Sequence, residues 1–193
     1  MRVACTWTVL MVLWASAGSA QTPGAQAGAE PPDFRVTVVG YILEDFQARV
    51  GSYLALRQTL EVGLPPLVAT DNPADILRAE RALAKRIRAA RAPRPGQLFT
   101  PDIRAEFRRV LRLESTADTV ESITGENPGE FSHDINGTYP KDRALATMPS
   151  NLLALLPQLP ADINYRFLGR MLVLHDTRAN VILDRIPCAL ACR

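Results

Sequence analysis

Apolar residues recur every three or four positions in the first half of the chain, which is the spacing of helices with one buried face. The first stretch covers about residues 36–62 and ends at Gly63 and the two prolines that follow. Its start is ambiguous, because residues 34–39 are β-branched and partly alternating. The stripe consists of Val39, Ile42, Leu43, Phe46, Val50, Tyr53, Leu54 and Leu60.

Capping sequences predict two further helices. Asn72 before Pro73 predicts a helix that runs to Arg91, and Thr100 before Pro101 predicts another that runs to about residue 113. The inner faces are expected to be Ile76, Leu77, Leu83, Ile87 and Ala90 in the first, and Ile103, Phe107, Val110 and Leu111 in the second. A short helical turn is expected over residues 117–124.

The pattern changes after Asn127-Pro128-Gly129, a strong turn sequence. Residues 130–135 predict a strand. Asn136-Gly137 then either closes a hairpin or bends a longer strand that reaches Tyr139. Residues 147–156 predict one more short helix, which ends at Pro157.

Three short strands end the chain. Residues 163–168, 171–175 and 181–186 are rich in apolar residues and separated by tight turns, which predicts an antiparallel meander with Tyr165 and Phe167 on one face. Such a small sheet is marginal alone and needs a cover. We therefore predict an α+β fold in which N-terminal antiparallel helices (33–125) pack on a small C-terminal antiparallel β-meander (within 127–187), as a single domain over 33–193.

The N-terminus has the order of a cleavable secretory signal. Met1-Arg2 precedes an apolar run over residues 3–14, and small residues follow up to Ala20. The run of about 12 residues is shorter than the roughly 20 that a spanning helix needs. We predict a signal peptide over 1–20, a disordered leader over 21–32, and a periplasmic or secreted protein with no transmembrane segment in its mature chain.

Composition narrows the classes of partner and cofactor. The chain carries 22 Lys and Arg against 20 Asp and Glu, so nucleic acid is not an expected partner. We recognise no cofactor or metal motif. Export leaves Cys188 and Cys192 in a compartment that permits a disulfide between them, the alternative being two free thiols on a frayed tail.

Histidine gives the one hypothesis for catalysis. Ser132-His133-Asp134 holds the residue types of a hydrolase triad, but neighbours on a strand point to opposite faces. His133-Asp134 and His175-Asp176 could form a metal site if their strands were adjacent. Surface histidines at strand ends are the ordinary interpretation.

Two polar groups could contact a ligand or partner. Arg78, Arg81, Lys85 and Arg88 share one helix face, which could meet anionic lipid or a cell-wall polymer, or could simply be a solvated face. The C-terminal turns concentrate polar residues that either lock the hairpins or form a ligand or partner patch. These are Arg170, His175, Asp176, Arg178, Asn180 and Asp184.

The stretch from Tyr165 to Pro187, together with Asn127-Pro128-Gly129-Glu130 and Tyr139-Pro140, resembles a group of uncharacterised exported bacterial proteins with helices first and a β-meander last. The cysteine-bearing tail departs from that group. The resemblance implies a Gram-negative periplasm and no known activity, so it assigns no active residue.

The leading hypothesis is a non-catalytic binding module of the bacterial envelope for a protein or small ligand. One alternative is an envelope-surface protein that makes peripheral contact with anionic lipid or cell-wall polymer through its basic helix. The other is an unrecognised hydrolase or metal enzyme that uses His133 and His175.

Overall fold

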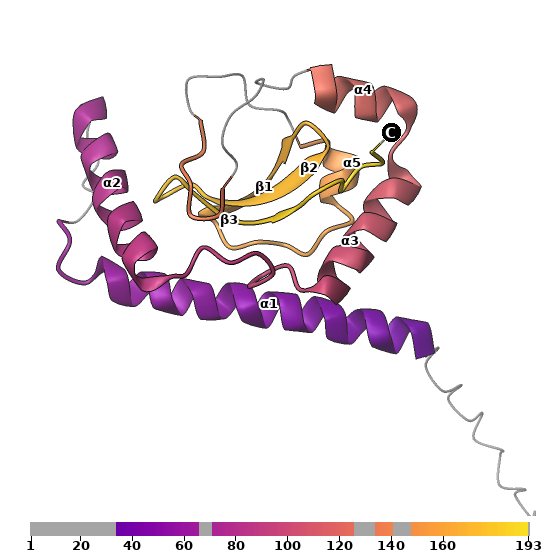
Figure 1. The fold of residues 1–193 in the computed structure, drawn as a ribbon, viewed down its shortest axis with the longest axis horizontal. Helices are drawn as coiled ribbons and strands as arrows, with labels where there is room; N and C mark the ends of the chain where they lie inside the picture. Colours follow the sequence, from indigo (N-terminus) through magenta and orange to yellow (C-terminus); the bar gives the residue numbers. More distant parts are fainter. Residues whose placement is uncertain (1–33, 66–70, 126–133, 141–147, 193) are drawn as a thin grey trace, which may run out of the picture. The chain divides into compact units, whose positions relative to one another are not determined.

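The computed structural model describes residues 34–65, 71–125, 134–140 and 148–192, and Asp33–Arg193 form one compact unit. The elements are α1 (Phe34–Glu61), α2 (Pro73–Ala90), α3 (Pro101–Glu114), α4 (Ala117–Gly125), α5 (Ser150–Leu153), β1 (Ile163–Leu168), β2 (Met171–Asp176) and β3 (Val181–Ile186). Figure 1 shows the α+β arrangement, with helices followed by a small antiparallel meander, so the predicted fold class is confirmed. The predicted signal peptide and leader lie outside the described residues.

Helix α1 begins earlier than its apolar stripe suggested. Residues 34–39, where the sequence leaves the start of the helix ambiguous, are helical rather than extended, although Val36 is 67% exposed. Once the downstream turns are formed, each further helical residue adds a hydrogen bond without a new nucleation cost. The buried part of the stripe centres on Phe46, Val50 and Tyr53.

Both predicted caps are present. The Asn72 side chain accepts a hydrogen bond from the Ala74 amide (3.1 Å), and Thr100 Oγ1 accepts one from the Ile103 amide (3.4 Å). Each satisfies a donor that the first helical turn leaves unpaired.

The predicted inner face of α2 is partly wrong. The buried residues of α2 are Glu80, Leu83, Ala84 and Ile87, whereas Ile76, Leu77 and Ala90 are exposed. The core-facing contacts thus come from the middle and second half of the helix, and its first turn makes none.

The sheet has the order β1-β2-β3 with antiparallel pairing throughout. Tyr165 lies opposite Leu174, which lies opposite Asp184. The β2–β3 register shifts between Leu174 and His175, and β2 extends one residue past the prediction, to Asp176.

Aromatic side chains join the helices to the face of the sheet that carries Tyr165 and Phe167. The Phe107 ring lies 5.2 Å from Phe46, 5.6 Å from Phe99 and 6.2 Å from Tyr165, centroid to centroid, in edge-on contacts. The opposite face carries a smaller buried cluster of Tyr139, Leu168, Val173 and Ile182. The helical part therefore covers one face, as expected for a small sheet.

Two local predictions need correction. The strand predicted over 130–135 lies mostly outside the described residues, but its end forms a turn, in which the Gly137 amide donates to the Asp134 carbonyl (2.8 Å). A Cβ at Gly137 would lie 2.7 Å from that carbonyl oxygen, so the turn requires glycine. Thr138 then forms an isolated bridge opposite Val181, and Ile182 of β3 exchanges backbone hydrogen bonds with Asn136 (2.8 Å) and Gly137 (2.9 Å).

The helix predicted over 147–156 is confined to Ser150–Leu153. The Leu155 and Leu156 amides bond three residues back, to Leu152 and Leu153 (3.2 Å each), which tightens the last turn ahead of Pro157. Within the described ranges, no helix is both long enough and apolar enough to cross a bilayer.

Candidate functional site

Asp176, at the end of β2, connects the sheet to α1. Its carboxylate is fully buried and accepts hydrogen bonds from the Tyr53 hydroxyl (2.6 Å) and from Arg57 Nη1 (3.2 Å). Its other oxygen accepts from the Arg178 and Ala179 amides (2.9 and 3.0 Å). Burial, and then the adjacent Asp176 charge, raise the pKa of the Tyr53 hydroxyl. The residue is thus enclosed by protein donors.

Asp184, in β3, connects the sheet to the loop between α2 and α3. It is also fully buried. One carboxylate oxygen accepts from the Leu98 and Phe99 amides (2.8 and 3.0 Å), and the other from the Gly96 and Arg185 amides (3.2 and 2.8 Å). This carboxylate fixes the loop that carries Phe99 into the core.

His175 and Asn180 form a buried pair at the β2–β3 turn. His175 Nε2 lies 2.9 Å from Asn180 Oδ1, and its ring centroid lies 4.6 Å from that of Tyr139. Asn180 adopts a positive φ of 51° and donates to the Tyr139 carbonyl (3.0 Å). His133 lies outside the described residues, and the part of the chain that is described holds no group of three or more His, Cys, Asp or Glu arranged for a metal ion.

The remaining two members of the predicted C-terminal patch also have protein partners. Arg178 pairs with Glu61 (2.9 Å), and Arg170 donates to the Ala191 carbonyl. Four of the six predicted residues, namely His175, Asp176, Asn180 and Asp184, are buried. The structure therefore does not bring the six together as one exposed surface.

The four residues of the predicted basic face on α2 have different surroundings. Arg78 pairs with Asp75 (2.9 Å), and Arg88 donates to the Asn136 carbonyl and to Thr138 Oγ1 (2.8 Å each). Arg81 and Lys85 are exposed. Arg88 thus helps to hold the 134–140 segment, and the two central residues face solvent.

Cys188 and Cys192 form a disulfide, with their Cα atoms 5.4 Å apart. Between them, Ala189 and Leu190 are fully buried. Of the two alternatives for these cysteines, the structure contains the bonded one, in a tail that packs into the core.

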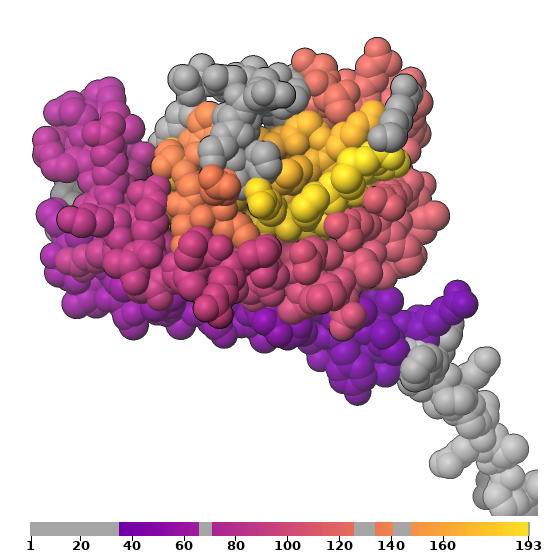
Figure 2. Space-filling view, viewed as in Figure 1, coloured from indigo at the N-terminus to yellow at the C-terminus, as the bar shows by residue number. Residues whose placement is uncertain are grey.

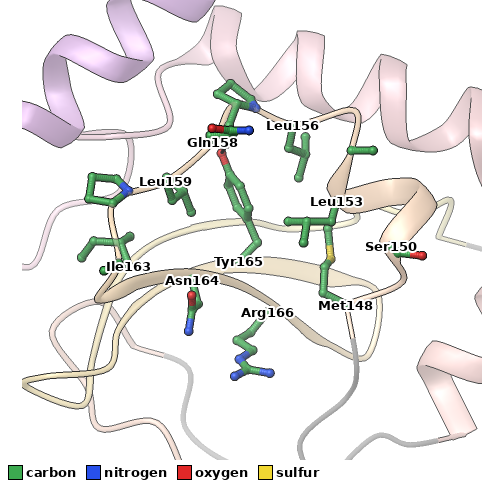
Figure 3. A pocket seen from close by; sticks show the side chains of 14 residues that line it. Met148, Ser150, Leu153, Leu156, Gln158, Leu159, Ile163, Asn164, Tyr165 and Arg166 are labelled. Atoms are coloured by element: carbon green, nitrogen blue, oxygen red, sulfur yellow. Dashed lines mark hydrogen bonds between the residues drawn. The ribbon is translucent and has the colours of Figure 1, made fainter.

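A groove of about 810 Å³ runs along the edge strand β1 and is lined by the segment that contains α5 and residues 154–161 and by residues from both sides of β1 (Figure 3). Figure 3 shows Tyr165 directed toward this segment, and Asn164 and Arg166 on the other side of β1. The Tyr165 hydroxyl donates to the Pro157 carbonyl (3.1 Å), and burial raises the pKa of Tyr165. This bond holds the segment over the sheet.

Most of the described residues that line the groove are apolar, and one of them is a cation. The described lining residues are Met148, Ser150, Leu153, Ala154, Leu156, Pro157, Gln158, Leu159, Pro160, Ala161, Ile163, Asn164, Tyr165 and Arg166. Leu153 is 47% exposed. Arg166 is the one charged residue of this set, and its Nε is buried with no hydrogen-bond partner among the described residues.

Sequence reasoning missed this groove. It assigned residues 147–156 to a helix and 163–168 to a strand without placing the two side by side. The available signal was Pro157 and Pro160, which force an extended crossing after a short helix, together with an arginine in a strand that is otherwise mostly apolar.

The chain has no significant match to any protein-family model, to any curated protein or to any solved structure.

Proposed function

We propose that this chain is an exported, non-catalytic binding module of the bacterial envelope, and that the groove beside β1 holds its ligand. The observation that carries the proposal is the groove itself, in which most of the described lining residues are apolar and Arg166 is the one charged residue among them. Its volume of about 810 Å³ falls within the range of about 300–1,000 Å³ that is usual for small-molecule sites.

The lining favours a small apolar ligand with one anionic group, for which we take a carboxylate. Leu153, Leu156 and Met148 offer apolar surface, and burial of an apolar chain there gains about 25 cal/mol per Å². The guanidinium of Arg166 has a buried donor with no partner in the described part of the chain. A carboxylate would satisfy it through a charge-assisted hydrogen bond.

Export is the second part of the proposal and rests on the sequence alone. A short positive start, an apolar run and small residues up to Ala20 are typical of a cleavable signal. N-terminal sequencing of protein from the native periplasm should find the chain beginning at Gln21. Recovery of Met1 on protein from the cytoplasm would refute this part and leave the groove untouched.

Binding is tested with octanoate, octylamine and octanol as probes, which share a chain and differ in head group. We expect octanoate to bind best and to shift the amide NMR signals of β1 and of residues 153–161. Arg166→Gln should weaken octanoate binding about tenfold, the typical loss of one charge-assisted hydrogen bond, and should leave octanol binding nearly unchanged.

Leu153→Asp should weaken the binding of all three probes, because it places a charge on the apolar wall of the groove. Leu77→Asp is the matched control, since Leu77 lies on α2 and is 40% exposed, close to the 47% of Leu153. Equal effects of the two leucine variants, or equal binding of octanoate and octylamine, would refute the groove as a site for apolar anions.

A further inference from the structure

Arginines converge on the C-terminal tail from two elements. Arg104, Arg108 and Arg112 are spaced four residues apart on α3, so they share one helix face at intervals of about 6 Å. Arg170, between β1 and β2, donates to the Ala191 carbonyl of the same tail. The C-terminal end of the chain lies beside α3 in Figure 1.

Backbone carbonyls position Arg108 and Arg112, two members of the arginine row, which consists of Arg104, Arg108 and Arg112. Arg108 donates through Nε (3.2 Å) and Nη2 (2.9 Å) to the Pro187 carbonyl, and Arg112 donates through Nη2 to the Cys188 carbonyl (2.7 Å). The disulfide closes the tail, and Leu190 is buried within it. The acceptors are therefore held by the core, and Figure 2 shows the tail packed against α3.

The row differs from the other arginines of α3 and α1 in its partners. Arg109 pairs with the Glu106 carboxylate (2.8 and 2.5 Å), and Arg57 pairs with Asp176 (3.2 Å). Among the described residues, no carboxylate lies within ion-pair distance of Arg104, Arg108, Arg112 or Arg170. Carbonyl oxygens accept hydrogen bonds without neutralising charge, so the cluster stays positive.

The repulsion between these charges affects the pKa of Arg108. Burial, and then the charges of Arg112 and Arg104, lower its pKa. An external anion would relieve this repulsion, and each guanidinium retains donors that can bind phosphate oxygens in pairs.

We propose that this arginine row, together with Leu113, is a docking surface for a bilayer of anionic phospholipid. Cations about 6 Å apart along a helix can contact several phosphates of an anionic surface at once, and each basic residue near such a surface adds to the affinity. Leu113 lies about 100° around the helix from Arg112 and is 70% exposed, so it adds an apolar side chain at the margin of the row, which can insert among lipid headgroups, a contact that a soluble polyphosphate would not reward.

The proposal is independent of the groove beside β1, with which it shares no residue. It is tested by sedimentation of the protein, purified from the periplasm of a bacterium expressing the full chain, with phosphatidylglycerol or phosphatidylcholine vesicles. We expect binding to phosphatidylglycerol alone, weakened by salt. Arg104→Gln with Arg112→Gln should weaken binding on the order of twentyfold, at about fivefold for each basic residue removed near an anionic surface.

Arg81→Gln with Lys85→Gln is the matched control, because it removes the same charge from the exposed face of α2. It should change binding less than about twofold. Leu113→Asn should weaken binding to vesicles and leave binding to soluble polyphosphate unchanged. Equal losses in the two double variants would attribute binding to net charge, and a Leu113→Asn variant that binds vesicles normally would assign the row to soluble polyanions. Either result overturns the proposal.

Discussion

The β2–β3 end of the sheet and the groove beside β1 use polar residues in opposite ways. At the β2–β3 end, the carboxylates of Asp176 and Asp184 are fully buried and surrounded by protein donors. Beside β1, Arg166 is the one charged side chain among the described lining residues, and none of them offers it a carboxylate. Many polar residues close together in turns can thus stabilise the fold through hydrogen bonds to one another. A single charged residue on an apolar wall remains available to a ligand.

Among the substitutions that test this comparison, Asp176→Ala should have the largest effect on stability. It removes the acceptor of the Tyr53 hydroxyl and of the buried Arg57 guanidinium, and breaking a buried ion pair typically costs about 3–5 kcal/mol. We expect a loss of about 3 kcal/mol in the free energy of unfolding, measured in urea, at the lower end of that range because Arg57 keeps its contact with Asp162 (3.1 Å). Asp45→Ala, which breaks the exposed Asp45–Arg49 pair, should cost less than about 1 kcal/mol. Equal losses of stability in the two variants would contradict a stabilising role for the buried Asp176 carboxylate.

Asp184→Asn should be next in size. The amide keeps the shape of the side chain but offers one acceptor oxygen, so two of the four backbone amides that now bond to Asp184 lose their partner. We expect a loss of about 2–3 kcal/mol. Hydrogen exchange should locate it, with faster exchange at the Gly96, Leu98 or Phe99 amides and no change in α5. Unchanged exchange in the 96–99 loop would show that the carboxylate does not hold it.

Local chemistry explains why the starts of α2 and α3 and the bounds of the three strands could be predicted closely. The Asn72 and Thr100 caps and the tight turns between strands are each decided by residues close in sequence. The role of Asp176 could not be predicted in the same way, because Tyr53 lies 123 residues away. The groove depends on the crossing of residues 154–161 over β1. Pro157 and Pro160 favour an extended chain there, but the bond from Tyr165 that holds this chain over the sheet joins two separate elements.

Alkaline pH offers a smaller test of the β2–β3 end. Burial, and then the charge of Asp176, raise the pKa of Tyr53 in the folded state, while an unfolded tyrosine ionises at about pH 10. Above about pH 10 the unfolded state has lost a proton that the folded state keeps, so the free energy of unfolding should fall as pH rises. Each such tyrosine contributes up to about 1.4 kcal/mol per pH unit.

Tyr53→Phe should therefore be less stable than the wild type at pH 8 and should lose less stability between about pH 10 and 11. Urea unfolding at a series of pH values measures the difference in slope. Tyr41→Phe is the control, because Tyr41 is 67% exposed. A Tyr53→Phe curve that stays parallel to the wild type above about pH 10 would show that Tyr53 ionises alike in both states.

The smallest expected effect belongs to the groove. Arg166→Met keeps most of the apolar stem and removes a buried Nε that has no partner among the described residues. Removing an unsatisfied polar group relieves its desolvation cost, so stability should be unchanged or should rise by up to about 1 kcal/mol. Arg57→Met, which instead leaves the buried Asp176 carboxylate short of a partner, should lose more than about 2 kcal/mol in the same urea experiment. A residue that serves a ligand rather than the fold should be dispensable for folding, so a loss at Arg166 as large as that at Arg57 would make Arg166 a structural residue and remove the cation from the proposed site.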